Sequence, residues 1–460
     1  MSAAIDTLLS RLAGVLPADA LRHDDASRIA YGYDNSRRQS LPDAVALPET
    51  AEQCAAIVAH CAELRVPLVA RGRGTNTTGA SVPIAAGLVL SCERMRRIIE
   101  VDPEDRVAVV EAGVLNGDLQ QAAAAHGLFF APDPTSAPFC SIGGNLACNA
   151  GGPRAVKYGA ARDNTLALRC SDGRGVLHRL GSRTTKGATG YDLMRLVIGS
   201  EGTLAVIAEA TLKLLPLPQS VRTLRALYRD VESAAAAVAR IMRQPQIPCA
   251  LEFMDAESVR RAREFGGADL PAAGALLMIE VDGAEAAIEH AVAAVSAAAR
   301  GDGLLQLDAA QSAAQVAQLW AARKALSPAL KHIAPRKINE DVVVPVSQLP
   351  ALVAKTRALA AASGIAIVCF GHAGNGNLHV NLMFDPANEA QAAQAPRVLA
   401  ELFATTIALG GTLSGEHGIG LEKRDFMPLA IAAQTLELMR AVKAQFDPHG
   451  ILNPGKLLPA

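Results

Sequence analysis

Aromatic residues are scarce in this chain, and their scarcity narrows the fold class. Only 3% of the 460 residues are aromatic although 50% are hydrophobic, so small aliphatic side chains carry most of the apolar content. Alanine is the strongest helix former, so this composition favours many helices packed closely on sheets. The length predicts two or three packed domains, since a single domain rarely needs so many residues.

A strong charge of one sign and long apolar runs are also missing. The net charge is -1, from 44 Lys+Arg and 45 Asp+Glu, which argues against a nucleic-acid-binding protein. No window holds ~18 uninterrupted apolar residues, so no membrane span is predicted. The N-terminus lacks the basic and apolar regions of a secretory signal. We therefore expect a soluble cytoplasmic protein, or one peripheral to the inner membrane.

Paired cysteines are absent as well. None of the eight cysteines stands in a Cys-x-x-Cys pair, which argues against an iron–sulfur cluster or a thiolate zinc site. We interpret them as scattered reduced thiols.

The first half of the chain contains several glycine-rich segments. The segment Arg71–Ala80 (RGRGTNTTGA) follows a short apolar stretch predicted to be a strand. Its glycines allow close backbone approach, and successive amides can bind an anion such as a pyrophosphate. The spacing matches neither the Rossmann nor the Walker pattern. Taken alone, the segment is also compatible with an ordinary turn.

Two further glycine-rich segments favour anion binding by Arg71–Ala80 over an ordinary turn. Pro134–Arg154 contains two Gly-Gly pairs, each beside an Asn, and Gly199–Leu204 is a tight turn before a strand. Residues 131–160 are expected to be irregular, and a long irregular stretch inside a compact domain is usually functional. Three such loops in one region favour a binding pocket.

The order and spacing of these loops resemble the FAD-binding domain of the vanillyl-alcohol-oxidase family, also called the PCMH-type domain, from about Pro42 to Pro218. The resemblance implies bound FAD. No His lies in the first loop, and Cys140 and Cys148 stand where small residues would do, so we expect non-covalent binding. The implied FAD contacts are Arg71, Gly72, Gly74, Thr75, Asn76, Thr77, Gly79, Ser141, Gly143, Gly144, Asn145, Asn149, Gly151, Glu201, Gly202, Thr203 and Asn453.

The last third carries the residues suited to chemistry. His372 and His379 flank a Gly-Asn break, and Glu416 and His417 lie between glycines. On a strand from Asn377, alternate residues share a face that His372 can join across the turn. Two imidazoles and a carboxylate suit a divalent metal with open positions, which can lower the pKa of a bound hydroxyl. The alternative is that these are ordinary core or loop histidines.

These motifs resemble the D-lactate, D-2-hydroxyglutarate and glycolate dehydrogenase branch of the family. The resemblance implies that His372, His379 and Glu416 bind a zinc or manganese ion, and that His417 is the base that takes the hydroxyl proton. A bound flavin would then take the hydride. The tail Leu452–Lys456 also matches and is expected near the flavin.

Substrate choice rests on a less distinctive stretch. Arg323, with Ser327 one helical turn later, resembles the arginine that grips the substrate carboxylate, although a solvated helix arginine is the alternative. Hydroxyglutarate-type members have Lys where this chain has Asn339, and the nearest Lys is Lys337. The difference favours a smaller acid such as D-lactate, unless a one-residue insertion keeps Lys337 in the pocket.

We therefore predict an α+β protein: a PCMH-type two-subdomain FAD domain, an antiparallel-sheet α+β cap with helices on one face of its sheet, and a C-terminal helical segment. The expected ranges are 1–41 (helical lead-in), 42–218 (FAD domain), 219–425 (substrate domain) and 426–460 (helix and tail). The predicted activity is oxidation of a D-lactate-like 2-hydroxy acid, with a cytochrome, a quinone or an electron-transfer flavoprotein as acceptor. Alternatives are a D-2-hydroxyglutarate dehydrogenase, the flavin subunit of a glycolate oxidase complex, and a flavin protein without redox chemistry. A homodimer is compatible with the sequence.

Overall fold

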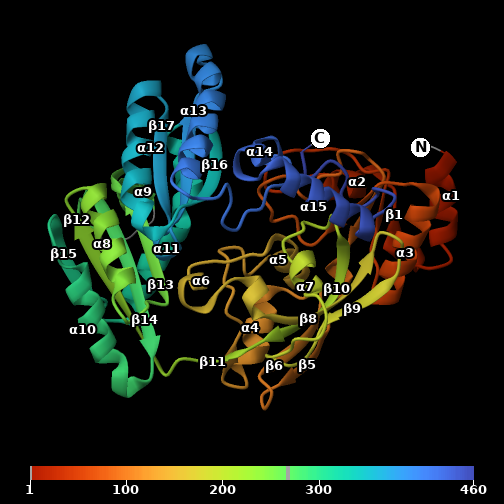
Figure 1. The fold of residues 1–460 in the computed structure, drawn as a ribbon, viewed down its shortest axis with the longest axis horizontal. Coiled ribbons are helices and arrows are strands. Elements are labelled where there is room, and N and C mark those ends of the chain that lie inside the picture. Colours follow the sequence, from red (N-terminus) through yellow and green to blue (C-terminus); the bar gives the residue numbers. More distant parts are fainter. Residues whose placement is uncertain (1–2, 266–269, 460) are drawn as a thin grey trace. The chain divides into compact units, whose positions relative to one another are not determined.

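The computed structural model describes residues 3–265 and 270–459 (Figure 1). The chain divides into two compact units. The first unit contains Met1–Gly151, Gly159–Leu217 and Glu416–Ala460. The second unit contains Gly152–Tyr158 and Pro218–Gly415.

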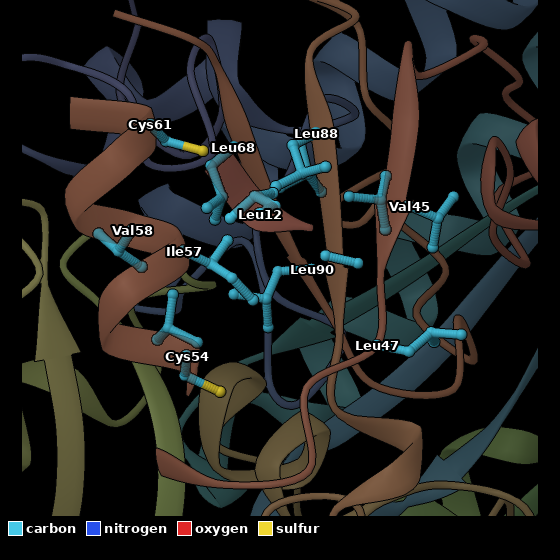
Figure 2. Packing of buried hydrophobic residues seen from close by; sticks show 14 of the residues in the cluster. Leu12, Val45, Leu47, Cys54, Ile57, Val58, Cys61, Leu68, Leu88 and Leu90 are labelled. Atoms are coloured by element: carbon cyan, nitrogen blue, oxygen red, sulfur yellow. The ribbon is translucent and has the colours of Figure 1, made fainter. Parts of the chain in front are cut away.

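The first unit begins with a four-stranded sheet in the order β1-β2-β4-β3, in which β2 and β3 run parallel to β4. Its elements are α1 (Ala3–Leu12), β1 (Leu21–Arg22), α2 (Asp25–Tyr31), β2 (Ala44–Ala46), α3 (Ala51–Leu64), β3 (Leu68–Arg71) and β4 (Leu88–Ser91). Figure 2 shows Ile57 of α3 pointing toward Leu68 and Leu90 of the strands, in a cluster that also contains Val58 and Leu88. Helix α3 begins after Thr50, whose side chain accepts a hydrogen bond from the amide of Gln53.

A five-stranded antiparallel sheet, in the order β5-β6-β10-β8-β9, completes the first unit. Its strands are β5 (Ile98–Asp102), β6 (Val107–Glu111), β8 (Thr165–Asp172), β9 (Leu177–Gly181) and β10 (Ala205–Lys213). Strands β8 and β9 form an antiparallel hairpin. The associated elements are α4 (Asn116–Ala124), β7 (Leu128–Phe129), α5 (Ile142–Cys148), α7 (Leu193–Val197) and β11 (Leu215–Pro216).

Helix α5 lies in the stretch that we expected to be irregular. Ser141 caps it by accepting a hydrogen bond from the amide of Gly144. A Cβ atom added at Gly143 would lie 2.7 Å from the Cβ of Ala112, so the glycine allows the helix to pack tightly there. Glycine is a poor helix former, which is why the sequence pattern hid this helix.

The second unit contains one seven-stranded antiparallel sheet in the order β15-β12-β14-β13-β17-β18-β16. Its strands are β12 (Ser220–Tyr228), β13 (Ala250–Asp255), β14 (Ala275–Gly283), β15 (Leu304–Ala309), β16 (Arg336–Val343), β17 (Ala366–His372) and β18 (Asn377–Phe384). Its helices are α6 (Ala155–Tyr158), α8 (Val231–Arg243), α9 (Ala256–Phe265), α10 (Ile288–Ala299), α11 (Ala313–Ala329), α12 (Leu349–Ser363) and α13 (Glu389–Ala408).

Our expectation that helices cover one face of this sheet is wrong. Helices α9 and α11 pack on the face that carries Leu227 and Met278. The next residue along β12, Tyr228, points to the opposite face and donates a hydrogen bond to the carbonyl of Ala299 in α10. Burial of every residue from Ala275 to Val281 reflects this cover on both faces.

The C-terminal segment belongs to the first unit. It contains α14 (Met427–Ala430) and α15 (Ala433–Phe446), and its tail then runs beside β3 through a parallel bridge between Leu68 and Leu452. Over the described residues, none of the helices has the length and apolar character needed to cross a membrane.

Candidate active site

Two of the glycine-rich loops meet in the first unit. Strand β3 ends at Arg71, and the loop that follows approaches the start of α5. A Cβ atom added at Gly72 would lie 2.5 Å from the Oγ of Ser141, so glycine is needed for this contact. The third loop is tied to the same helix, because the amides of Gly199 and Glu201 donate to carbonyls of α5 at 2.9 and 2.8 Å. The structure thus brings all three predicted loops together.

Three predicted FAD contacts use their side chains to hold protein backbone. The Nδ2 of Asn76 donates to the carbonyl of His417 at 2.9 Å. The Oδ1 of Asn453 accepts from the amide of Ala70 at 2.9 Å. The carboxylate of Glu201 accepts from the amides of Ile419 and Gly420 at 2.6 and 2.7 Å.

These bonds position the backbone around His417. Burial raises the pKa of the Glu201 carboxyl, while the two amide bonds lower it. His417 itself is half-buried, and its carbonyl is bound by the first glycine-rich loop. The candidate base is therefore anchored within the unit that is predicted to bind FAD.

In the second unit, two strands place the predicted metal ligands on one face. Phe370 pairs with His379 in the register of β17 and β18, so His372, two residues further along, shares their face. The ring centroids of His372 and His379 are 5.3 Å apart, and the rings are nearly perpendicular.

Glu416 follows directly on Gly415, whose amide donates to the Asp341 carboxylate at 2.8 Å. One ligand atom each from His372, His379 and Glu416 lies within 4.8 Å of the others. Two nitrogen ligands and one oxygen ligand at this spacing fit a divalent ion with open positions. The three predicted ligands are therefore brought together.

Glu252 joins this cluster and is not among the residues predicted from the sequence. It pairs with His372 in the register of β13 and β17, and it is 0% exposed. One carboxylate oxygen lies 2.6 Å from the Nδ1 of His372, and the other accepts from the Nε of Arg323 at 2.8 Å. Burial alone would raise the pKa of this carboxyl, but the charges of His372 and Arg323 lower it to about 2. A glutamate in the apolar run Ala-Leu-Glu-Phe-Met was the available signal.

The structure also places the three predicted substrate residues. Arg323 is 8% exposed and lies over the ring of Phe370, 4.7 Å from its centroid, which excludes a solvated helix arginine. The Nζ of Lys337 donates to the Oγ of Ser327 at 2.7 Å. Asn339 pairs with Asn381 and so faces the same side as His379. Lys337 is thus engaged by Ser327.

Comparison with known proteins decides the family. Residues 217–457 match the family model "FAD linked oxidases, C-terminal domain", and residues 42–181 match "FAD binding domain". The chain belongs to the FAD-linked oxidases.

Several relatives of this FAD-linked oxidase cover nearly its whole length. It is 38% identical to the glycolate oxidase subunit GlcD of Bacillus subtilis, over 94% of this chain and 93% of that protein. It is 34% identical to the D-lactate dehydrogenase of Anaerostipes hadrus, over 96% and 94%. It is 33% identical to the D-2-hydroxyglutarate dehydrogenase of Stutzerimonas stutzeri, over 98% and 99%.

Solved structures show the same fold. That of p-cresol methylhydroxylase with bound substrate matches with a TM-score of 0.83 at 14% identity, over 100% of this chain and 98% of that one. The predicted PCMH-type fold is therefore confirmed.

The glycine-rich loops of this oxidase also fit FAD by their polar atoms. Buried atoms without a hydrogen-bond partner among residues 3–265 and 270–459 include the Oγ1 of Thr77, the Nδ2 of Asn145 and the Oγ of Ser200. Buried polar atoms in folded proteins are rarely left without partners. Hydroxyl and amide groups beside close-packed glycines suit the phosphates and the polar edge of FAD, so the residues present fit this cofactor.

Proposed function

We propose that this FAD-linked oxidase is a dehydrogenase that oxidises a small 2-hydroxy monocarboxylate, of which D-lactate is the type, to the 2-keto acid. The observation that carries the proposal is the second-unit cluster in which Glu252 contacts both Arg323 and His372, with His379 beside His372; the two histidines belong to the group of three possible metal ligands that also includes Glu416. It combines a carboxylate-binding cation with ligands for a hydroxyl-activating metal.

Each residue has a separate task in the proposed reaction. His372, His379 and Glu416 would hold a zinc or manganese ion, which lowers the pKa of a substrate hydroxyl. Arg323 binds the substrate carboxylate through its terminal guanidinium nitrogens, because its Nε is already bonded to Glu252. His417 accepts the hydroxyl proton. When bound, FAD supplies the hydride acceptor.

The FAD contacts proposed for the first unit are those predicted from its three loops. Their side chains divide into two groups. Thr77 and Asn145 present buried polar atoms, whereas Asn76, Glu201 and Asn453 hold the backbone. FAD binding is therefore proposed to depend mostly on backbone amides and glycine clearance, without a covalent bond.

The residue at position 339 supports a monocarboxylate over hydroxyglutarate. A second carboxylate on the substrate would need its own cation. Asn339, which stands where hydroxyglutarate-type members carry Lys, offers only an amide.

A second candidate is the flavin subunit of a glycolate oxidase. The similarity to GlcD of Bacillus subtilis, at 38% identity, specifically favours it. In that case, further subunits with cluster-binding cysteines would carry electrons away, and they should copurify with the chain. Otherwise, the acceptor is a cytochrome, a quinone or an electron-transfer flavoprotein.

An anaerobic substrate panel tests the proposal. The FAD-loaded protein is mixed with D-lactate, glycolate, D-2-hydroxyglutarate and L-lactate, and flavin absorbance is followed. We expect fast bleaching with D-lactate or glycolate and slow or no bleaching with the other two. The absence of bleaching with every 2-hydroxy acid would disprove the proposed activity and favour a flavin protein without redox chemistry.

A further inference from the structure

We propose that Glu252 is a positioning residue that couples metal binding to recognition of the substrate carboxylate. The inference rests on the proposed function, because it concerns a metal ligand and the carboxylate-binding arginine of the same site. It assigns to one buried side chain the task of fixing both.

The first contact of Glu252 fixes the tautomer and the orientation of His372. The distance between its Oε1 and the Nδ1 of His372 is 2.6 Å, and both side chains are buried. A carboxylate oxygen facing the Nδ1 of a metal-binding histidine accepts its hydrogen, so this geometry assigns the hydrogen of His372 to Nδ1. The Nε2 of His372 then keeps its lone pair as the ligand atom. Carboxylate–histidine pairs of this kind orient the ligand and raise its basicity in metal sites.

The second contact fixes Arg323. Its Nε donates to the Oε2 of Glu252 at 2.8 Å, while the ring of Phe370 lies under the guanidinium at 4.7 Å. The arginine is therefore held along one edge and on one face. Only its terminal nitrogens remain for a substrate carboxylate, and their direction depends on Glu252.

The same residues form a closed circuit around the candidate metal site. Phe370 also lies against His379, with ring centroids 5.7 Å apart, and His379 lies against His372 at 5.3 Å. Within this circuit, Glu252 is the residue bonded to both a metal ligand and Arg323. A change at Glu252 should therefore weaken metal binding and carboxylate binding together.

Glu252→Gln tests this coupling with almost no change in volume. A glutamine replaces one of the two carboxylate oxygens with an NH2 donor, so one of the two positions that face His372 and Arg323 can no longer accept. One of the two buried donors must turn away or lose its partner.

Glu280→Gln is the matched control. Glu280 is a buried glutamate on the neighbouring strand β14, and it accepts from Thr223 and Trp320 at 2.7 and 2.8 Å. Both bonds end on its Oε1, an acceptor that glutamine keeps, so this variant neutralises a buried glutamate without changing a contact of His372 or Arg323.

The experiment measures two affinities of the FAD-loaded protein. Metal is removed with a chelator and Mn²⁺ is titrated back, followed by electron paramagnetic resonance. Pyruvate binding to the metal-loaded protein is followed by the flavin spectrum. Melting curves and FAD content check folding. For Glu252→Gln we expect Mn²⁺ affinity to fall by about 10- to 100-fold, with a weaker pyruvate affinity and a higher KM. Glu280→Gln should match wild type in both affinities.

The possible outcomes separate the inference from the proposed function. A Gln variant that binds Mn²⁺ and pyruvate as wild type does overturns the inference alone, and so does the loss of only one affinity. A wild-type protein that takes up no metal overturns the proposed function and the inference together. If the Gln variant does not fold, Glu252→Asp replaces it, since it keeps both acceptors on a shorter chain. Both affinities should then fall by less, and an unchanged pair of affinities overturns the inference.

Discussion

The first-unit loops and the second-unit cluster use buried polar groups in opposite ways. Around the loops, clearance comes from glycines such as Gly72, and side-chain atoms such as the Nδ2 of Asn145 have no protein partner in the described chain. In the cluster, both oxygens of Glu252 are bonded to neighbouring side chains. The loops therefore leave polar atoms available to a ligand, whereas the side chains of the cluster are already held by hydrogen bonds to one another.

This difference matches the demands of the two proposed tasks. Holding a large cofactor needs many weak contacts from backbone, and glycine makes these possible. Proton and hydride transfer need a few side chains held in one geometry. Variants that disable one region and leave the other intact test this comparison most directly.

His417→Ala should produce the largest effect, by removing the proposed base while leaving the flavin bound. General-base catalysis contributes about 10²- to 10⁴-fold, so turnover with D-lactate or glycolate should fall by that order. FAD should stay bound, because Asn76 holds the backbone of this residue and not its ring. Steady-state kinetics and flavin absorbance measure the two effects.

The exposed His449 supplies the control, since His449→Ala should leave turnover at its wild-type value. Turnover that survives in His417→Ala would show that another group is the base. Loss of FAD from that variant would show that the two tasks cannot be separated.

Gly72→Ala should have the converse effect. The new methyl group would lie 2.5 Å from the Oγ of Ser141, which already caps α5. Overpacking of this kind costs about 1–3 kcal/mol, and we expect that cost to appear as weaker FAD binding. Metal uptake should be unchanged, as measured by metal analysis beside the ratio of flavin to protein absorbance.

Gly117→Ala is the matched control. Its methyl group would lie no closer than 3.5 Å to the nearest atom, an ordinary contact, within α4. An alanine there should keep FAD and slightly stabilise the protein. Wild-type FAD content in Gly72→Ala would contradict the assigned loop contact.

The same contrast explains what could be predicted from the sequence. The residues of a loop site follow one another in the sequence, so Arg71–Ala80 could be recognised. The alternation of a strand also correctly placed Asn377, His379 and Asn381 on one face of β18. The Glu252–His372 pair was not recognisable, because its members are 120 residues apart and meet only through strand pairing.

Local propensity failed where packing overrode it. The segment Ile142–Cys148 forms a helix despite two glycines, since Ser141 caps it and Gly143 fits against Ala112. The second-unit sheet has helices on both faces, which the unbroken apolar stretch in β14 indicates better than the order of its elements does. The contacts of Gly143 with Ala112 and of the helices with β14 join segments that are distant in the sequence, and periodicity does not describe such contacts.

Lys456→Met should give the smallest effect, and it tests the first unit alone. Lys456 is 4% exposed, and its Nζ has no hydrogen-bond partner in the described chain. Burial lowers the pKa of Lys456 to about 7, and the charge of Arg71 also lowers it. The charges of Asp34 and Glu201 act in the opposite direction and raise this pKa. An unfolded lysine has a pKa near ~10.4. Between these values, the unfolded chain holds a proton that the folded FAD-free chain does not.

It follows that this lysine makes the stability of the FAD-free protein rise with pH, by at most about 1.4 kcal/mol per pH unit. The advantage of Lys456→Met over wild type should therefore be greatest at pH 6 and smaller at pH 9, as measured by urea unfolding. Lys456→Arg cannot lose its charge, so its stability should not rise in this way between pH 6 and pH 9. It should be the least stable of the three proteins at pH 9. A constant difference between Met variant and wild type across this range would contradict the assigned burial. With FAD bound, the phosphate charges should favour the protonated lysine. The pH range in which the stability rises should then move to higher pH, as expected if the loops bind an anion.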